Sequence, residues 1–197
     1  MKQSITRIAQ FICFSIALLI ATGCATHIKV DDTRNPAPKE AFNAFTRFEV
    51  QKVTLAPAYA GQEANERAWK KIQENVDTNL GDTVSAWNKA GEGKPVRTLV
   101  VAPQITEVKF INGNARFWAG AMAGSSAVVM RVTITEKETG LVIATPVFYA
   151  RASAMGGTWT FGATDNIMLT RIAGNFTDYL KNNYPAAVGG PTGVDKK

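Results

Sequence analysis

Histidine and cysteine are scarce in this sequence of 197 residues, which limits the chemistry that the chain can support. The one histidine is His27, near the N-terminus, and the two cysteines are Cys13 and Cys24. These residues are too few to form a Cys/His cluster of the kind that binds structural or catalytic zinc. The serines likewise lack a histidine that could activate a hydroxyl for nucleophilic attack. We therefore expect no metal site, no cofactor and no catalytic residue, and a protein that is not an enzyme.

Long apolar runs and clusters of like charge are also missing. The apolar run at residues 11–20 is shorter than the roughly 20 residues that a membrane-spanning helix needs. Lys and Arg outnumber Asp and Glu by 22 to 16, but the basic residues are scattered along the chain. Such scattering is typical of solvated faces rather than of a nucleic-acid footprint. The sequence thus predicts neither a spanning helix nor a nucleic-acid partner.

The N-terminus has the arrangement of a secretory signal. Lys2 and Arg7 precede the apolar run, and the small residues Thr22 and Gly23 precede Cys24. This stretch resembles the lipobox of bacterial lipoproteins, which implies removal of residues 1–23 and acylation of Cys24. Two or more acyl chains hold a protein stably on a membrane. The alternative is a plain signal peptide that leaves Cys24 as a free thiol.

The residues around the predicted cleavage site also indicate a location. Cys13 would be removed with the signal, so the mature chain would have one cysteine and no internal disulfide. In the sorting rule of enterobacterial lipoproteins, an Asp after the acylated cysteine retains the protein in the inner membrane. Ala25 stands there instead, which implies the periplasmic face of the outer membrane. Without Lys2 and Arg7 the chain keeps 20 basic and 16 acidic residues, a net charge of +4.

Composition along the chain predicts one folded domain between two flexible ends. Residues 24–45 contain Asp31-Asp32 and Asn35-Pro36-Ala37-Pro38, without a sustained apolar period, and predict a flexible lipidated tether. Residues 46–185 carry the regular patterns of a single α/β domain. Residues 186–197, with Gly189-Gly190-Pro191, predict a disordered tail.

Apolar periodicity predicts the elements of the first half of the domain. Residues 46–55 alternate, with a change of phase at Gln51-Lys52 that is typical of a bulge in a strand. A helical stripe follows and ends before Gly91 and Gly93. The residues of the stripe are Trp69, Ile72, Val76, Leu80, Val84 and Trp87.

The second half predicts three strands and a closing helix. Residues 99–111 are rich in β-formers but change phase between Ile105 and Val108, and Pro103 predicts a bend or an edge position. Residues 128–135 alternate, residues 136–140 form a hairpin turn, and residues 141–152 return. A helix runs from Thr164 or Asp165 to Tyr184. The order β-α-β-β-β-α predicts a two-layer α/β (α+β) sandwich, with a mixed four-stranded sheet and two helices on one face.

Two segments rich in glycine and aromatic residues, 112–126 and 155–162, are connections that the topology places at one end of the sheet, together with Tyr59. The candidate partner-binding residues on them are Arg116, Phe117, Trp118, Trp159 and Phe161. Aromatic and Arg side chains supply apolar area and planar hydrogen bonding to an interface. A second interpretation is that these aromatics plug the end of the core.

Gly120 and Gly124 form a G-x-x-x-G pattern, which allows close packing of helices. The surrounding apolar run is too short to span a membrane. Close packing within the domain is one interpretation, and a subunit contact in a homo-oligomer is the other.

A wider pattern resembles a known group of proteins. Arg116-x-x-x-Gly120-x-x-x-Gly124-Ser125-Ser126, an alternating strand, Glu138-Thr139-Gly140, a second strand and a helix resemble a group of Gram-negative lipoproteins whose domain has no assigned function. The resemblance covers residues 97–184. The element order is also similar to that of the periplasmic domains of the curli-secretion lipoprotein and of lipoprotein activators of penicillin-binding proteins. Similarity of fold does not transfer function.

Three functions follow as hypotheses. The first is a non-enzymatic lipoprotein that is anchored to the membrane through Cys24 and binds a periplasmic protein through the two glycine-rich segments. The second is a homo-oligomeric component of an envelope or secretion complex, packing through Gly120 and Gly124. The third is an enzyme or small-ligand carrier that acts on envelope material.

Overall fold

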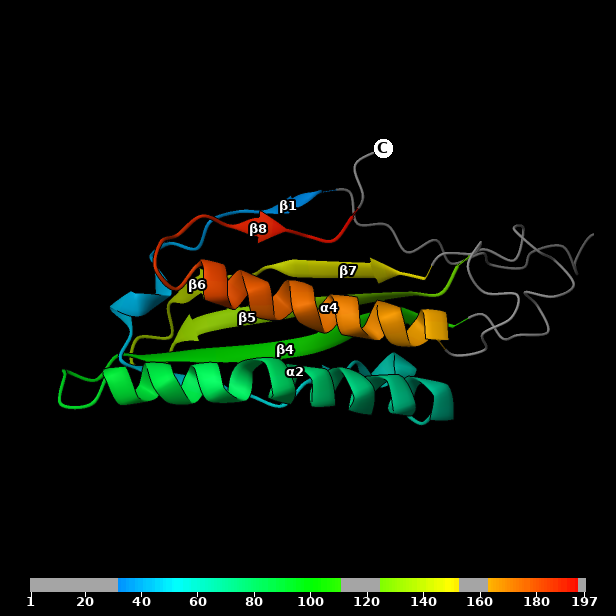
Figure 1. Cartoon of the computed structure of the whole chain (residues 1–197), viewed down its shortest axis with the longest axis horizontal. Coiled ribbons are helices and arrows are strands. Elements are labelled where there is room, and N and C mark those ends of the chain that lie inside the picture. Colours follow the sequence, from blue (N-terminus) through cyan, green and yellow to red (C-terminus); the bar gives the residue numbers. More distant parts are fainter. Residues whose placement is uncertain (1–31, 111–124, 153–162, 195–197) are drawn as a thin grey trace, which may run out of the picture.

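The structure, a computed structural model, describes residues 32–110, 125–152 and 163–194 (Figure 1). Two helices pack on a mixed sheet, which confirms the predicted two-layer α/β sandwich. The elements are β1 (Arg34–Asn35), η1 (Phe42–Ala44), β2 (Arg47–Val50), β3 (Thr54–Leu55), η2 (Pro57–Tyr59), α2 (Glu63–Ala90), β4 (Thr98–Lys109), β5 (Ala127–Glu136), β6 (Val142–Ala144), β7 (Val147–Arg151), α4 (Ala163–Asn182) and β8 (Gly190–Pro191).

The main sheet consists of four ribbons, as the sequence predicts. β2 and β3 are successive pieces of one edge ribbon, and both run parallel to β4. β4 pairs antiparallel with β5, and β5 pairs antiparallel with both β6 and β7, which are pieces of the other edge ribbon. The interruption between Val50 and Thr54 contains the predicted change of phase at Gln51-Lys52.

Pro103 lies in a central strand, so the predicted edge position is wrong. β4 is continuous from Thr98 to Lys109, and its register shifts between Ile105 and Glu107, where the sequence changes phase. Opposite Pro103, the amide of Val132 points away and donates to Pro146 O at 2.9 Å. The proline nitrogen therefore faces the first ribbon, where that ribbon is interrupted. Because no strand pairs regularly with it there, the missing N–H removes no ladder hydrogen bond.

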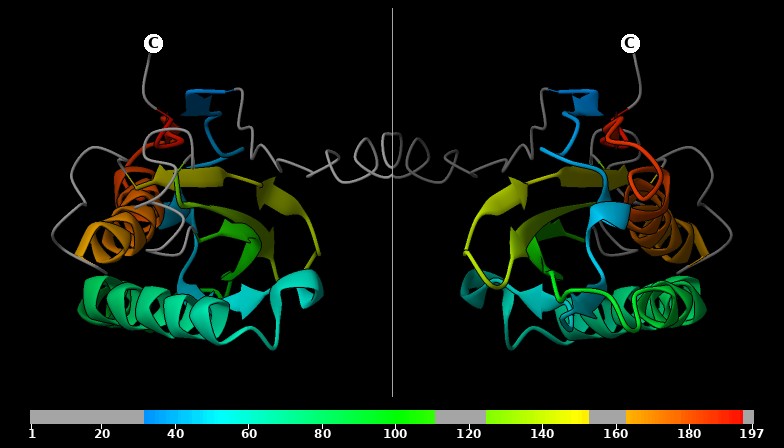
Figure 2. Two further views of the ribbon diagram at one scale, coloured as in Figure 1. Left: turned by 90° about the vertical axis from the view of Figure 1, so that its right-hand side faces the viewer. Right: turned by 90° about the vertical axis from the view of Figure 1, so that its left-hand side faces the viewer.

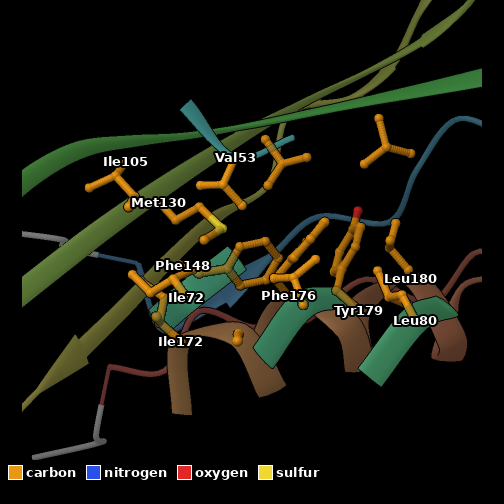
Figure 3. Close-up of a cluster of buried hydrophobic side chains, with 14 of the residues drawn as sticks. Val53, Ile72, Leu80, Ile105, Met130, Phe148, Ile172, Phe176, Tyr179 and Leu180 are labelled. Atoms are coloured by element: carbon orange, nitrogen blue, oxygen red, sulfur yellow. The ribbon is translucent and has the colours of Figure 1, made fainter. Parts of the chain in front are cut away.

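The core fills the space between the helices and one face of the sheet. Ile72 and Leu80 from α2 meet Phe176 and Leu180 from α4, and all four are 3% exposed or less. Figure 3 shows these side chains pointing toward residues of the sheet, including Met130. The end-on views of Figure 2 show both helices beside a curved sheet. The helical stripe that the sequence predicts is thus the face of α2 that packs into the core.

The segments predicted to be a flexible tether and tail are folded over residues 32–45 and 186–194, so these two predictions are wrong there. β1 pairs antiparallel with β8. Phe42 is completely buried and Phe45 is 3% exposed, so this part of the chain contributes to the core. Gly189 has φ +71°, and a Cβ there would lie 2.5 Å from Asn35 O. The glycine that suggested disorder instead allows a close approach of two chain segments.

Side chains cover both edges of the main sheet. At the first ribbon, Asn88 accepts from Phe48 N–H at 2.7 Å and donates to Phe48 O at 3.2 Å. At the last ribbon, Asn35 accepts from Val147 N–H at 2.7 Å and donates to Val147 O at 2.9 Å. Each side-chain amide replaces the backbone of a further strand at that point. Exposed edge strands favour edge-to-edge aggregation, and these contacts protect against it.

Candidate functional site

The two glycine-rich connections begin and end at one end of the sheet, as the sequence predicts. In the sheet register, Lys109 is opposite Ala127, and Ala127 is opposite Arg151. These residues are therefore neighbours on three adjacent strands. Lys109 lies before the first connection, Ala127 follows it, and Arg151 lies before the second connection. Helix α4 resumes the chain at Ala163 at the same end (Figure 1). We call this region the loop end.

Both described termini of the chain also lie toward the loop end. Tyr149 lies two residues before Arg151 on β7, and it donates its N–H to Thr192 O at 2.7 Å. Thr192 in turn donates its N–H to Thr33 O at 3.0 Å and its hydroxyl to Asp32 O at 2.7 Å. Asp32 and Val194 therefore lie close to the level of Tyr149 and Arg151. The described chain thus begins and ends in the half of the molecule nearer the loop end, on the outer side of β7.

The predicted site residues themselves lie outside the described residues. This applies to the lipidation site Cys24, to the candidate partner-binding residues Arg116, Phe117, Trp118, Trp159 and Phe161, and to the candidate subunit-contact residues Gly120 and Gly124. Tyr59 is described, in the turn η2 that follows β3. Its half-buried ring packs against the core, as the plug interpretation predicts for that one aromatic.

The described part of the loop end carries basic side chains that the sequence interpretation counted among scattered, solvated residues and did not assign to a site. Arg151 is exposed and Lys109 half-buried, and neither forms an ion pair with another described residue. Both lie on the face of the sheet away from the helices, as does Arg131 further along β5. Glu107 is the neighbouring acidic residue on β4, and in the sheet register it lies between the levels of Lys109 and Arg131. Their positions directly beside the glycine-rich segments were the available signal, but it required the topology to be known.

The opposite end of the molecule, which we call the hairpin end, carries a partly buried charge cluster. Arg97 donates to both carboxylate oxygens of Glu40, at 2.8 and 3.1 Å, and to Glu136 at 2.7 Å. Its guanidinium carbon lies 4.5 Å from the centroid of the Phe45 ring. These hydrogen bonds to Glu40 and Glu136 raise the pKa of Arg97 further above its ordinary value. Arg97 therefore stays charged and joins three separate segments of the chain.

Two acidic residues of the hairpin turn are held in their charged form. The Thr139 hydroxyl donates to Glu136 at 2.6 Å, and this bond together with the bond from Arg97 lowers the pKa of Glu136. The Thr98 amide donates to Glu138 at 2.8 Å and lowers the pKa of that carboxyl group. Because its carboxylates accept hydrogen bonds from internal donors, this cluster has the properties of a structural ion-pair network that holds chain segments together, rather than of a reactive site.

Metal binding and membrane insertion find no support in the described residues. Within residues 32–110, 125–152 and 163–194, no group of three or more His, Cys, Asp or Glu side chains is arranged to hold a metal ion. The same residues contain no helix that is both long enough and apolar enough to cross a membrane.

Comparisons with known proteins give fold-level likenesses only. No protein-family model matches the chain, and no curated protein matches it. Among 28 matching chains of solved structures is the PelC dodecamer of Paraburkholderia phytofirmans, with 12% identity, 79% of this chain and 97% of that chain covered, and a TM-score of 0.42. Protein XCC0632 of Xanthomonas campestris gives 11% identity, 76% and 90% coverage and 0.39.

A third solved structure is a candidate lipoprotein from Caulobacter crescentus, with 10% identity, 68% of this chain and 86% of that chain covered, and a TM-score of 0.35. At such identities and with TM-scores below 0.5, none of these likenesses supports a statement about function or assembly. The resemblance to curli-secretion and penicillin-binding-protein-activator lipoproteins stays a prediction from the sequence.

Proposed function

We propose that this chain is a non-enzymatic lipoprotein on the periplasmic face of the outer membrane, anchored by lipid on Cys24, which binds an envelope protein at its loop end. The observation that carries the proposal is the convergence at the loop end. Asp32 lies at the level of Tyr149, so the segment from Cys24 joins the folded part in the same half of the molecule as both glycine-rich segments.

The proposed chemistry is recognition rather than catalysis. Lys109 and Arg151 are cations without an ion-pair partner among the described residues, and they flank segments that contain Arg116, Trp118 and Trp159. Arg and aromatic side chains at the centre of an interface contribute most of its binding energy. Basic residues around them accelerate association with an acidic partner and fix its orientation.

Mass spectrometry of the protein purified from membranes tests the anchor. The expected result is a chain that begins at Cys24 and carries the mass of its acyl groups. The Cys24→Ser variant, which cannot be acylated on sulfur, is expected in the soluble fraction. A wild-type chain that begins elsewhere, or that begins at Cys24 without added mass, contradicts the anchor.

Crosslinking in cells followed by purification tests the loop end. The expected result is a captured envelope protein that is lost in the Trp118→Ala and Trp159→Ala variants. Lys94→Ala, an exposed change at the hairpin end, is the matched control and is expected to keep the partner. Circular dichroism establishes that each variant is folded. Capture unaffected by both tryptophan changes contradicts the proposal, and capture of this chain alone favours the homo-oligomer instead.

A further inference from the structure

We infer that the loop end faces the lipid headgroups of the membrane that holds Cys24, and that the hairpin end points away from it. The inference rests on the proposed acylation of Cys24 and adds an orientation to it. It also bears on the partner, because the short tether favours a protein that is embedded in that same membrane.

The length of chain between the lipid and the folded structure is the first argument. Residues 25–31 are all that separate Cys24 from Asp32, whose carbonyl accepts the Thr192 hydroxyl. At no more than about 3.5 Å per residue, the eight steps from Cys24 to Asp32 span at most about 28 Å. As a flexible chain they span about 16 Å on average. The tether is therefore much shorter than the 24–45 segment that the sequence predicts.

The length of the domain is the second argument. β4 runs from the hairpin end at Thr98 to the loop end at Lys109, and its eleven steps at about 3.3 Å cover about 36 Å. α2, with 28 residues at about 1.5 Å each, is about 42 Å long. Asp32 lies at the level of Tyr149, which is opposite Val129 and through it Glu107, so nine steps of β4, about 30 Å, separate that level from Thr98. A domain standing on its hairpin end would therefore need the tether at or beyond its full extension of about 28 Å, which strongly disfavours that orientation.

The charge of the loop end supports the headgroup layer as its neighbour. Lys109 and Arg151 lie in one row on either side of Ala127, without acidic partners among the described residues. The acidic residues at the start of α2 are already engaged, because Glu63 pairs with Arg67 and Glu66 accepts from the amide of Gly61. Glu107, two residues before Lys109 on β4, is the acidic neighbour of these two cations, so positive charge is in excess on this part of the sheet and favours the anionic phosphates of a lipid surface.

The short tether also bears on what kind of protein can reach the loop end. A separate folded domain of about 100 residues has a radius of gyration of about 13 Å and is therefore roughly 30 Å across. Such a domain is as wide as the longest span that the eight steps from Cys24 to Asp32 allow, about 28 Å. The tether therefore favours a protein partner that presents its surface in the membrane itself.

Fluorescence quenching on vesicles tests the orientation with the lipidated, full-length mature protein. Acylation blocks the Cys24 sulfur, so a single introduced cysteine takes up the fluorophore. The positions are Arg151→Cys at the loop end, Lys94→Cys at the hairpin end, and Thr133→Cys and Asp82→Cys at mid-height on the sheet and on α2. The vesicles contain phosphatidylethanolamine, phosphatidylglycerol and a lipid with a nitroxide on its headgroup.

The expected result is that the label at Arg151 loses most of its fluorescence and the label at Lys94 keeps most of it. Quenching at Lys94 equal to that at Arg151 overturns the inference. So does the strongest quenching at Thr133 or Asp82, which indicates a domain lying on one face. If mass spectrometry finds no lipid on Cys24, the result contradicts the proposed function and not the orientation. This measurement comes before any quenching experiment.

Discussion

Two glycines, one within α2 and one at its C-terminus, differ in whether the fold can accept a larger residue at their position. Gly91 ends α2 with φ −87°, a conformation open to any residue, yet a Cβ there would lie 1.9 Å from Thr46 O. Gly81, ten residues earlier, is exposed and has nothing within 4 Å of its Cβ position. Close approach, rather than backbone conformation, thus requires glycine at position 91.

The two alanine substitutions should have opposite effects on the free energy of unfolding. Gly91→Ala forces the end of α2 away from Thr46 and is expected to cost about 1–3 kcal/mol. Gly81→Ala replaces a poor helix former at an open position and is expected to stabilise by about 0.5–1 kcal/mol. Urea unfolding of both variants beside the wild type measures the two values. A neutral Gly91→Ala shows that the approach of Thr46 is not tight.

Glu136 makes a second prediction at this level, through pH. Its side chain is 8% exposed, and hydrogen bonds from Thr139 and Arg97 lower its pKa below 4.5. A carboxyl group with a lowered pKa in the folded state adds stability above its unfolded pKa, and that stability is lost as the pH falls through the folded value. We therefore expect the unfolding midpoint in urea to decrease as the pH is lowered from about 4.5.

The Glu136→Gln variant separates this effect from general acid denaturation. It cannot gain a proton at that position, so its urea midpoint is expected to depend less on pH below about 4.5 than that of the wild type. Part of the dependence stays, because the pKa of Glu138 is also lowered by the Thr98 amide. Glu92→Gln, an exposed change next to Gly91, serves as the control. Identical pH profiles for Glu136→Gln and the wild type contradict the assignment.

Elements that depend on a repeating apolar pattern could be predicted from the sequence, whereas contacts between distant segments could not. The stripe from Trp69 to Trp87 and the alternation in β5 report which side of each element is buried, so the helix, the strand and their layers follow. The break opposite Pro103 required two ribbons to be seen together. Pro103 alone indicates an edge strand, but a central strand accepts it because the neighbouring ribbon is interrupted there and needs no hydrogen bond from its nitrogen.

The chain termini show the same limit more strongly. Asn35, Gly189 and Gly190 lie in sequence that has the composition of a linker, and no local period marks them as structured. Their structure comes from partners more than a hundred residues away, as in the two hydrogen bonds between Asn35 and Val147. The candidate loop end was predictable in part, because hairpin topology places alternate connections at one end. The position of Asp32 relative to that end was not predictable, because it depends on the contact of Asp32 with Thr192.

Asn35 carries the element-level prediction. Its 6%-exposed side chain holds the edge of β7, so Asn35→Ala leaves both backbone groups of Val147 without their partner. The expected cost is about 1–3 kcal/mol, and each 1.4 kcal/mol or so corresponds to about tenfold faster exchange of the Val147 amide. Hydrogen exchange measured by NMR reports that amide directly.

Asn43→Ala is the matched control for this experiment. Asn43 lies in the same N-terminal segment but is exposed, and its side chain forms no hydrogen bond with another described residue. Its substitution is expected to leave exchange at Val147 unchanged. Equal exchange rates in Asn35→Ala and Asn43→Ala would show that the backbone pairing of β1 with β8, rather than the Asn35 side chain, protects the edge of β7.

The molecule as a whole has two unlike ends. The hairpin end joins Glu40, Arg97 and Glu136 in one partly buried cluster, and Trp87 stacks on Tyr184 beside it at 4.3 Å between ring centroids. At the loop end, Lys109 and Arg151 precede the two glycine-rich connections and lie on either side of Ala127. The two ends thus differ in chemistry, which suits a domain that works in one orientation.

Tether length should control that orientation. Inserting 24 Gly and Ser residues between Ala25 and Thr26 raises the average span of the tether from about 16 to about 31 Å and its fully extended length to roughly 110 Å. The hairpin end can then reach the membrane, so quenching of labels at Arg151→Cys and Lys94→Cys is expected to become similar. Replacing residues 26–31 by six Gly and Ser residues keeps the length and should keep the difference. If the long tether also keeps it, contacts of the loop end, and not the tether, hold the domain upright.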